Sequence, residues 1–316
     1  MNIPEAKTAF LFPGQGAQYI GMSRSFYENY QPARDQFDNA VCDFDIKDLC
    51  FDGPEETLRE TRYSQACIFL ASIVIAQMLF DNGIRPDAAA GISLGEYTAL
   101  CFADSFSVQE GVELLTERGR VMADFIPKDS GMAVVLALDS QQVADACEEV
   151  GQLGACEIAS YITSERTVIT GNLDAVQHAG ELCRERGAKM VIPVNASGAF
   201  HSVLAERAAS EFEKVMQDYE IDEPSLPVYF NYDGSKKHSN IKKMEVGQLQ
   251  NSVQFVATVQ NMLKDGIRRF ISIGPGATMA SFVQDTAKAQ KAPVETYVVD
   301  TYEDAKKLIA QLGINS

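Results

Sequence analysis

The sequence has few basic residues and only three histidines. Lys and Arg number 27 against 44 Asp and Glu, so the 316-residue chain carries a formal net charge of −17 at pH 7. Proteins that bind nucleic acid or a membrane surface need Lys and Arg to contact phosphate groups. The charge balance therefore argues against nucleic acid and membrane as partners.

Paired cysteine motifs are absent. The seven cysteines form no C-x-x-C pair, and Cys67 and Cys101 lie inside apolar runs. An odd number of scattered, apolar cysteines predicts reduced thiols rather than a disulfide framework or a zinc site. We therefore expect a cytoplasmic protein without a metal ion or redox cofactor.

Long hydrophobic runs are also missing. The longest, from Ala66 to Phe80, contains Ser72 and Gln77 and falls short of the ~20 residues that a membrane crossing needs. The N-terminal stretch MNIPEAKTAFLF lacks a signal-peptide pattern. The apolar run is interpreted as a buried helix within a predicted helix over 64–82.

Strands and helices alternate along most of the chain. Residues 8–12 form an apolar run that stops at Pro13-Gly14, which predicts a buried strand and a loop. Further strands are predicted at 88–91, 228–231 and 269–273, and further helices at 22–30, 108–123, 203–219, 248–264 and 277–287. Such alternation is typical of an α/β domain, here with a hydrolase-like parallel sheet.

A different order interrupts this domain. Residues 132–194 are predicted to run strand, helix, strand, strand, helix, strand, which is the order of a ferredoxin-like unit. Ser130-Gly131 and Ser197-Gly198 bracket this segment as plausible hinges. We therefore predict a discontinuous large α/β domain, 1–129 with 199–316, and an inserted small ferredoxin-like domain, 130–198.

The stretch Gly91-Ile-Ser93-Leu-Gly95 fits a nucleophile elbow. A strand is predicted before it and a helix after it, and glycines at both flanks permit the sharp turn that exposes the serine oxygen. The alternative is an ordinary strand-to-helix turn in which Ser93 is an N-cap. If Ser93 is a nucleophile, another group must accept its proton.

His201 is the candidate base. His178 and His238 lie in polar stretches and are interpreted as solvated, whereas His201 lies where the predicted insert returns to the large domain. Imidazole exchanges protons near neutral pH, which suits it to activate a serine. No Asp or Glu stands out as the third member of a triad, so a carbonyl oxygen could orient the ring instead.

Two more segments are candidates for the site. FPGQGAQ, residues 12–18, fails the dinucleotide pattern because Tyr19 occupies the third glycine position, but its backbone N–H groups could stabilise an oxyanion. Arg118 lies among apolar residues of a predicted helix and could bind a substrate carboxylate. The alternatives are a plain tight turn and a solvated arginine.

The motifs FPGQGAQ, GISLGEY, ERGRVM, GAFHS, NSVQF and IGPG occur in the order and at roughly the spacing of the malonyl-CoA:acyl carrier protein transacylases. The chain resembles this family over essentially its whole length. The resemblance implies malonyl transfer from coenzyme A to the phosphopantetheine thiol of an acyl carrier protein, with coenzyme A as part of a substrate. A free-standing acyltransferase of a polyketide synthase is similar enough to remain an alternative.

The resemblance also implies roles for individual residues. Ser93 would be the nucleophile and His201 the general base, oriented by the main-chain carbonyl of Gln248. The backbone N–H groups of Gln15 and Leu94 would form the oxyanion hole. The residues implied to contact the malonyl group are Arg118, which would bind its carboxylate, and Gln65 and Phe200, which would line its pocket.

This sequence departs from the family at Ile92, where a histidine is usual, and at Ser160 and Ile162, where asparagines are usual. The charge of −17 also requires a local basic patch if an acidic carrier is to dock, with Arg184, Arg186 and Lys189 as candidates. Two other functions remain open: a serine hydrolase of acyl esters or thioesters, and a non-catalytic scaffold.

Overall fold

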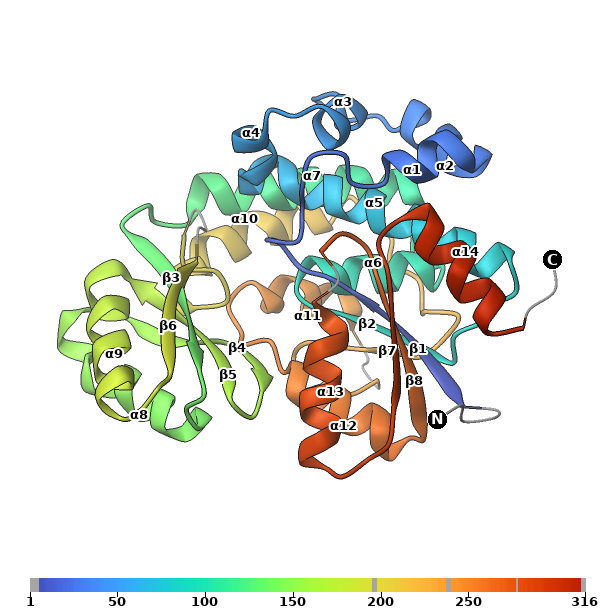
Figure 1. Cartoon of the computed structure of the whole chain (residues 1–316). Helices are drawn as coiled ribbons and strands as arrows, with labels where there is room; N and C mark the ends of the chain where they lie inside the picture. The colour runs from blue at the N-terminus through green and yellow to red at the C-terminus, as the bar shows by residue number, and fades with distance from the viewer. Residues whose placement is uncertain (1–5, 195–197, 237–239, 277, 314–316) are drawn as a thin grey trace. The chain divides into compact units, whose positions relative to one another are not determined.

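The computed structural model describes residues 6–194, 198–236, 240–276 and 278–313 (Figure 1). Ser197 of the predicted second hinge and His238 lie outside these ranges. The chain divides into a first unit of Met1–Gly119, Tyr219–Phe230 and Val259–Ser316, and a second unit of Arg120–Asp218 and Asn231–Thr258. The predicted insert falls within the second unit. Its boundaries remain predictions, because compactness does not show that a segment folds independently.

The first unit is built on a five-stranded parallel sheet in the order β7-β2-β1-β8-β9. Strands buried on both faces of a parallel sheet read as continuous apolar runs, and β1 is buried from its second residue to its last. The strands are β1 (Lys7–Phe12), β2 (Ala88–Gly91), β7 (Val228–Tyr229), β8 (Ile267–Ile273) and β9 (Glu295–Val299).

Helices pack on both faces of this sheet. Figure 1 shows α5 and α14 on one side of the strands and α13 on the other. The helices of the first unit are α1 (Arg24–Asn29), α2 (Gln31–Asn39), α3 (Ile46–Phe51), α4 (Glu55–Arg59), α5 (Thr61–Asp81), α6 (Leu94–Phe102), α13 (Met279–Ala289) and α14 (Tyr302–Gln311). Two more, α7 (Val108–Phe125) and α12 (Phe255–Lys264), contribute residues to both units.

The helix α5 is the central apolar element of the first unit. At 21 residues it is longer than the apolar run predicted, and it is the one helix among the described residues long and apolar enough to span a membrane. The expectation that the segment is too short was therefore wrong. However, 83% of its most apolar window is buried inside the structure, as expected for a core helix.

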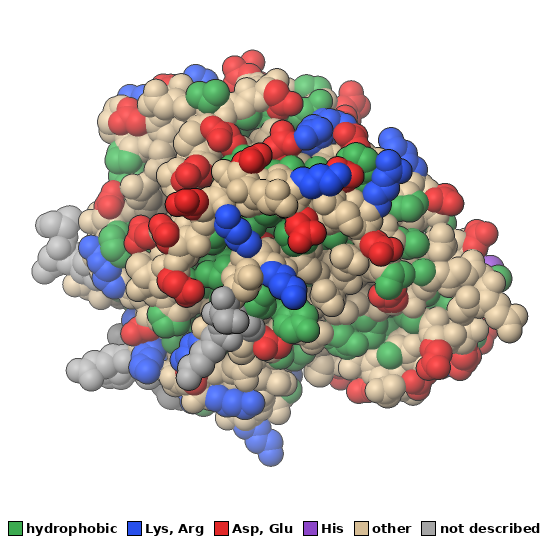
Figure 2. Space-filling view, turned by 180° about the vertical axis from the view of Figure 1, so that it is seen from behind, with side chains coloured by type: hydrophobic (Ala, Val, Ile, Leu, Met, Phe, Trp, Pro, Cys, Tyr) green, Lys and Arg blue, Asp and Glu red, His purple; other side chains and the backbone are tan. Residues whose placement is uncertain are grey.

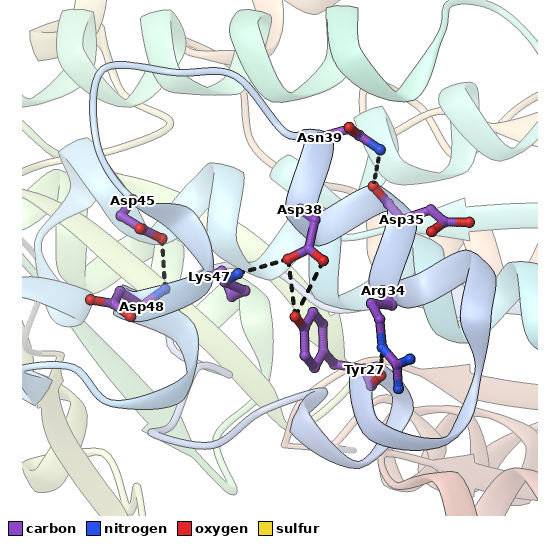
Figure 3. A network of polar contacts seen from close by, with 8 residues as sticks. All are labelled: Tyr27, Arg34, Asp35, Asp38, Asn39, Asp45, Lys47 and Asp48. Atoms are coloured by element: carbon purple, nitrogen blue, oxygen red, sulfur yellow. Dashed lines mark hydrogen bonds and ion pairs between the residues drawn. The ribbon is translucent and has the colours of Figure 1, made fainter.

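The short helices α1 to α3 are joined by polar contacts (Figure 3) and by packing among the rings of Tyr27, Phe37 and Phe51. The Asp38 carboxylate accepts a hydrogen bond of 3.0 Å from the Tyr27 hydroxyl and forms an ion pair of 2.7 Å with Lys47. Asp45 caps α3 by accepting from the Asp48 N–H at 2.8 Å. Because these helices are only 6 to 9 residues long, sequence periodicity predicted only α1.

The second unit contains a four-stranded antiparallel sheet in the order β4-β5-β3-β6. With α8 and α9 on one face of the sheet (Figure 1), this is the predicted ferredoxin-like unit. Its strands are β3 (Ser130–Leu136), β4 (Cys156–Thr163), β5 (Arg166–Asn172) and β6 (Met190–Val194). The second unit as a whole contains the helices α8 (Ser140–Glu149), α9 (Leu173–Glu185), α10 (Glu206–Met216) and α11 (Ile241–Gln248). The predicted fold class, α/β with a parallel sheet and a small antiparallel subdomain, is confirmed.

Each edge of the small sheet carries a contact from a residue outside its four strands. At the β4 edge, Val253 forms a parallel bridge with Ser160 and exchanges backbone hydrogen bonds of 2.8 Å with Ala159 and Tyr161. At the β6 edge, the Arg184 guanidinium donates to the Val191 carbonyl at 3.1 Å. Pro193 in the middle of β6 has no N–H to donate.

Several predicted boundaries differ from the structure. The segment 248–264 is not continuously helical, because α11 ends at Gln248 and residues 249–254 turn to form the β4 bridge before α12 begins. The predicted helix 203–219 is a 3₁₀ turn, Val203–Ala205, followed by α10. The strand β9 and the helices α2, α3, α4, α11 and α14 were not predicted.

Candidate active site

Ser93 lies in the sharp turn between β2 and α6. Its backbone has φ 54° and ψ −110°, which is a strained conformation for a residue with a side chain. Leu94 is the first residue of α6, and the next two N–H groups, of Gly95 and Glu96, donate to the carbonyls of Ile92 and Ser93 at 2.9 Å and 3.0 Å. The turn therefore presents the Ser93 hydroxyl beside the start of a helix, which is the geometry of a nucleophile elbow.

Two glycines make this turn possible through close backbone packing. A Cβ atom on Gly91 would lie 2.0 Å from the carbonyl carbon of Gly95. A Cβ atom on Gly95 would lie 2.3 Å from the carbonyl oxygen of Phe12, at the end of β1. These separations are far below van der Waals contact, so any side chain at either position would displace the turn.

Arg118 holds the elbow serine from α7. Its guanidinium donates to Ser93 Oγ at 3.1 Å and to Gln65 Oε1 at 2.5 Å, and it lies 5.1 Å from the ring centre of Tyr97. The arginine is 1% exposed, so the interpretation as a solvated side chain was wrong. The next residue, Gly119, allows α7 to approach α5, because a Cβ there would lie 2.5 Å from the Thr61 carbonyl oxygen.

The loop after β1 lies at the same end of the sheet as the elbow. Parallel strands end at one edge, and β1 and β2 are neighbours, so Pro13 and Ile92 leave the sheet side by side. The Ile92 N–H donates to the Phe12 carbonyl at 3.1 Å. The Gln15 side chain is fixed by a hydrogen bond of 2.9 Å to the Thr61 hydroxyl.

In the second unit, His201 is oriented by a backbone carbonyl. His201 Nδ1 lies 2.8 Å from the carbonyl oxygen of Gln248, the last residue of α11. A carbonyl can only accept, so Nδ1 carries the proton and Nε2 keeps its lone pair. His201 is 5% exposed, and its φ of 56° is left-handed. This arrangement prepares Nε2 to accept a proton.

Two contacts hold residues 198–200, which directly precede His201. The Ser130 hydroxyl, at the start of β3, accepts from the Ala199 N–H at 2.9 Å. A Cβ on Gly198 would lie 2.6 Å from Ile126 Cγ2, so a glycine permits this approach. Phe200 is 7% exposed.

The predicted site residues thus fall into two groups. In the first unit, hydrogen bonds join Ser93, Arg118 and Gln65, while Gln15 and Leu94 lie in the adjacent loop and helix start. In the second unit, His201 and Gln248 are bonded and Phe200 precedes the histidine. Sequence reasoning missed Tyr97 and Thr61. The spacing could have indicated Tyr97, because it lies one helical turn after Ser93 on α6.

The chain is similar in sequence to known acyltransferases. The acyl transferase domain family matches residues 9–313. The chain is 35% identical to the malonyl CoA-acyl carrier protein transacylase of Bacillus subtilis over 90% of this chain and 92% of the relative. It is 31% identical to the polyketide biosynthesis transacylase PksC of the same organism, over 90% of this chain and 98% of the relative.

Solved structures agree with these relatives. The malonyl CoA-acyl carrier protein transacylase of Clostridium perfringens superposes with a TM-score of 0.92 at 30% identity, covering 98% of both chains. The malonyl-transacylase PlMCAT, solved with the type II polyketide acyl carrier protein AntF, superposes with a TM-score of 0.92 at 28% identity, covering 97% of this chain and all (100%) of that one. The chain belongs to the malonyl-CoA:acyl carrier protein transacylase family of acyltransferases.

Proposed function

We propose that this protein transfers a malonyl group from malonyl-CoA, through a Ser93 ester, to the phosphopantetheine thiol of an acyl carrier protein, and so supplies fatty acid synthesis. The observation that carries the proposal is the buried guanidinium of Arg118 bonded to Ser93 Oγ at 3.1 Å. A short acyl group held at Ser93 has its far end near this cation. A carboxylate there would form a bidentate ion pair.

In the first half-reaction, Ser93 Oγ attacks the thioester carbonyl while His201 Nε2 accepts the hydroxyl proton. This requires the imidazole to reach the serine in the working enzyme. The backbone N–H groups of Gln15 and Leu94 stabilise the oxyanion. Collapse of the tetrahedral intermediate breaks the carbon–sulfur bond, and His201 returns its proton to the coenzyme A thiolate.

In the second half-reaction, the carrier thiol gives its proton to His201 and its sulfur attacks the Ser93 ester. The intermediate collapses to malonyl-carrier, and Ser93 recovers the proton. A thioester is an activated acyl donor, because the thiolate that it releases is a good leaving group. A neutral serine-histidine pair oriented by a carbonyl is therefore enough, without an acid as a third member. Phe200, by its bulk, would disfavour a 2-methyl substituent.

Intact mass spectrometry after mixing with malonyl-CoA tests the chemistry. The wild-type protein should gain one malonyl group, and Ser93→Ala should gain none. No increment on the wild type would support a scaffold. A transient increment that is lost to water as fast without a carrier as with one would support a hydrolase.

The carboxylate clamp separates malonyl transfer from hydrolysis of neutral acyl chains. Arg118→Ala should reduce malonyl loading far more than acetyl loading, because only malonate carries the second carboxylate. Equal losses for both acyl groups would contradict the clamp. Lys at this position keeps the charge but not the bidentate geometry, so it should recover loading only in part.

The carrier needs its own test, because one relative is named a malonyl CoA-acyl carrier protein transacylase and another a polyketide biosynthesis transacylase, at 35% and 31% identity. Figure 2 shows acidic side chains spread over one face, with basic ones scattered among them. Of the basic candidates for docking, Arg186 is paired with Glu149 and Arg184 contacts the Val191 carbonyl. Lys189 is exposed, and its charge reversal should raise the KM for carrier. Comparing transfer to a fatty acid carrier with transfer to a polyketide carrier tests the pathway.

A cytoplasmic location accords with this proposal. All seven cysteines are free, and two of them, Cys42 and Cys156, are partly accessible. Thiols in such positions persist where the compartment is reducing.

A further inference from the structure

A partly exposed carboxylate ties together two loops at the catalytic end of the parallel sheet. Asp300 directly follows β9, at the same edge as the loops after β1 and β8. Its Oδ1 accepts a hydrogen bond of 2.8 Å from the Tyr19 hydroxyl. Its Oδ2 accepts one of 3.3 Å from the Gly276 N–H. Tyr19 ends the loop that contains Gln15, and Gly276 ends the IGPG motif.

These two loops are packed backbone to backbone. A Cβ on Gly276 would lie 2.9 Å from the carbonyl oxygen of Ala17, and a Cβ on Gly274 would lie 2.9 Å from Pro13 Cδ. Both glycines have positive φ, of 71° and 124°. The β8 loop therefore supports the Pro13–Tyr19 loop from one side, and Asp300 is the acceptor that both loops share.

Asp300 is not needed to begin α14. Thr301 is the N-cap of that helix and forms a reciprocal capping box with Asp304. The two carboxylate oxygens of Asp300 point instead to Tyr19 and Gly276. Burial raises the pKa of Asp300, while the bonds from Tyr19 and Gly276 oppose that rise. The carboxylate is only partly exposed, so these two donors replace part of its contact with water.

We infer that Asp300 is a positioning residue for malonyl transfer: it fixes the Pro13–Tyr19 loop so that the Gln15 backbone N–H stays aimed at the oxyanion. The inference rests on the proposed function, which gives Gln15 that role. An oxyanion donor must lie within a few tenths of an ångström of its place, and a loop held only by its chain ends would not keep it there. Asp300 would act through Tyr19 and Gly276, without touching substrate.

Two substitutions weaken this tie without removing much volume. Asp300→Asn leaves one oxygen, so it can accept from Tyr19 or from Gly276 but not from both. Tyr19→Phe removes the hydroxyl alone. The matched control is Tyr30→Phe, because Tyr30 donates to Asp81 in a similar pair elsewhere in the first unit.

Rapid-quench measurement of Ser93 malonylation separates positioning from binding. Losing an oxyanion donor outright costs a rate factor of about 10²–10³, so loosening its loop should slow acylation about tenfold. We expect that loss in Asp300→Asn and a smaller one in Tyr19→Phe. The half-saturating malonyl-CoA concentration should stay unchanged. The double variant should be no slower than Asp300→Asn, since both changes break one tie.

Hydrogen exchange of residues 13–19 gives a readout independent of activity. Exchange should be faster in Asp300→Asn and Tyr19→Phe than in the wild type or Tyr30→Phe. Acylation rates and loop exchange equal to those of Tyr30→Phe would overturn the inference. A wild type that never becomes malonylated would refute the proposed function instead, and loop exchange alone would then decide whether Asp300 holds the loop.

Discussion

The two groups of site residues are held in different ways. In the first unit, Ser93, Arg118 and Gln65 are fixed by side chains bonded to one another, and glycines let their backbones approach. In the second unit, the His201 ring is fixed by a main-chain carbonyl. A side-chain tie depends on the identity of both residues, whereas a backbone tie depends on the fold. Substitution of the residue that makes the tie should therefore cost far more in the first group than in the second.

The largest effect should come from Gly91→Ala. The new methyl group would meet the Gly95 backbone, so the elbow must shift and Ser93 with it. Overpacking of this kind costs about 3 kcal/mol. We expect that loss in urea unfolding, together with loss of detectable malonyl loading.

Gly151→Ala is the matched control for this change. Nothing lies within 4 Å of a Cβ at Gly151, in the second unit. It should load malonyl at the wild-type rate. A Gly91→Ala protein that does the same would show that the elbow is less constrained than its packing indicates.

The next effect should come from Gln65→Leu. This substitution removes the Oε1 acceptor of Arg118 within a buried site, which costs about 1–3 kcal/mol of unfolding free energy. Arg118 should also lose its orientation, so malonyl loading should fall more than acetyl loading. Parallel loading assays with both coenzyme A esters measure this, and an unchanged ratio would argue against a positioning role for Gln65.

A pH-dependent effect is expected in the core of the second unit. Burial raises the pKa of the Cys183 thiol to about 11 from its ordinary value of 9.0. The folded state disfavours the thiolate, so its contribution to stability is complete below pH 9 and is lost as the pH rises toward 11. At pH 10 the loss should be about 1 kcal/mol.

Urea unfolding between pH 8 and pH 11 measures this loss. In Cys183→Ala, the unfolding free energy at pH 10 should fall by about 1 kcal/mol less than in the wild type. Other buried thiols and tyrosines should leave some dependence on pH in the variant. An equal slope in the variant and the wild type would contradict the assignment to Cys183.

The smallest effect should come from Gln248→Ala. The group that orients His201 is the backbone carbonyl, which the substitution keeps, and the contact of the side chain with Glu245 is long, at 3.5 Å. We expect a loading rate within about twofold of the wild type. A loss as large as that of Gln65→Leu would end the contrast between the two groups.

Much of the fold could be predicted because its signals are local. The strand β2 was predicted with its observed bounds, Ala88–Gly91, and the ferredoxin-like order was read from alternating apolar runs. Both predictions depend on the spacing of apolar residues along the chain and on the positions of glycines. The capping box at Thr301 to Asp304 is a local signal of the same kind, but it was not recognised, and α14 was not predicted.

Other elements depend on contacts distant in sequence. The turn after Gln248 interrupts a helical pattern because Val253 pairs with β4, about ninety residues earlier. Arg118 and Gln65 are separated by 53 residues, and their bond appears only when α5 and α7 pack together. Family motifs could name these residues, but the arrangement of hydroxyl, guanidinium and amide required the structure.

The contacts at the two edges of the small sheet have a consequence for behaviour in solution. Exposed strand edges recruit strands from other molecules, and that recruitment begins aggregation. Here Val253 covers one border, while Pro193 and Arg184 obstruct the other. The small sheet should therefore stay unaggregated at high protein concentration, even though Met190, Ile192 and Val194 leave apolar side chains 49%, 41% and 37% exposed along it.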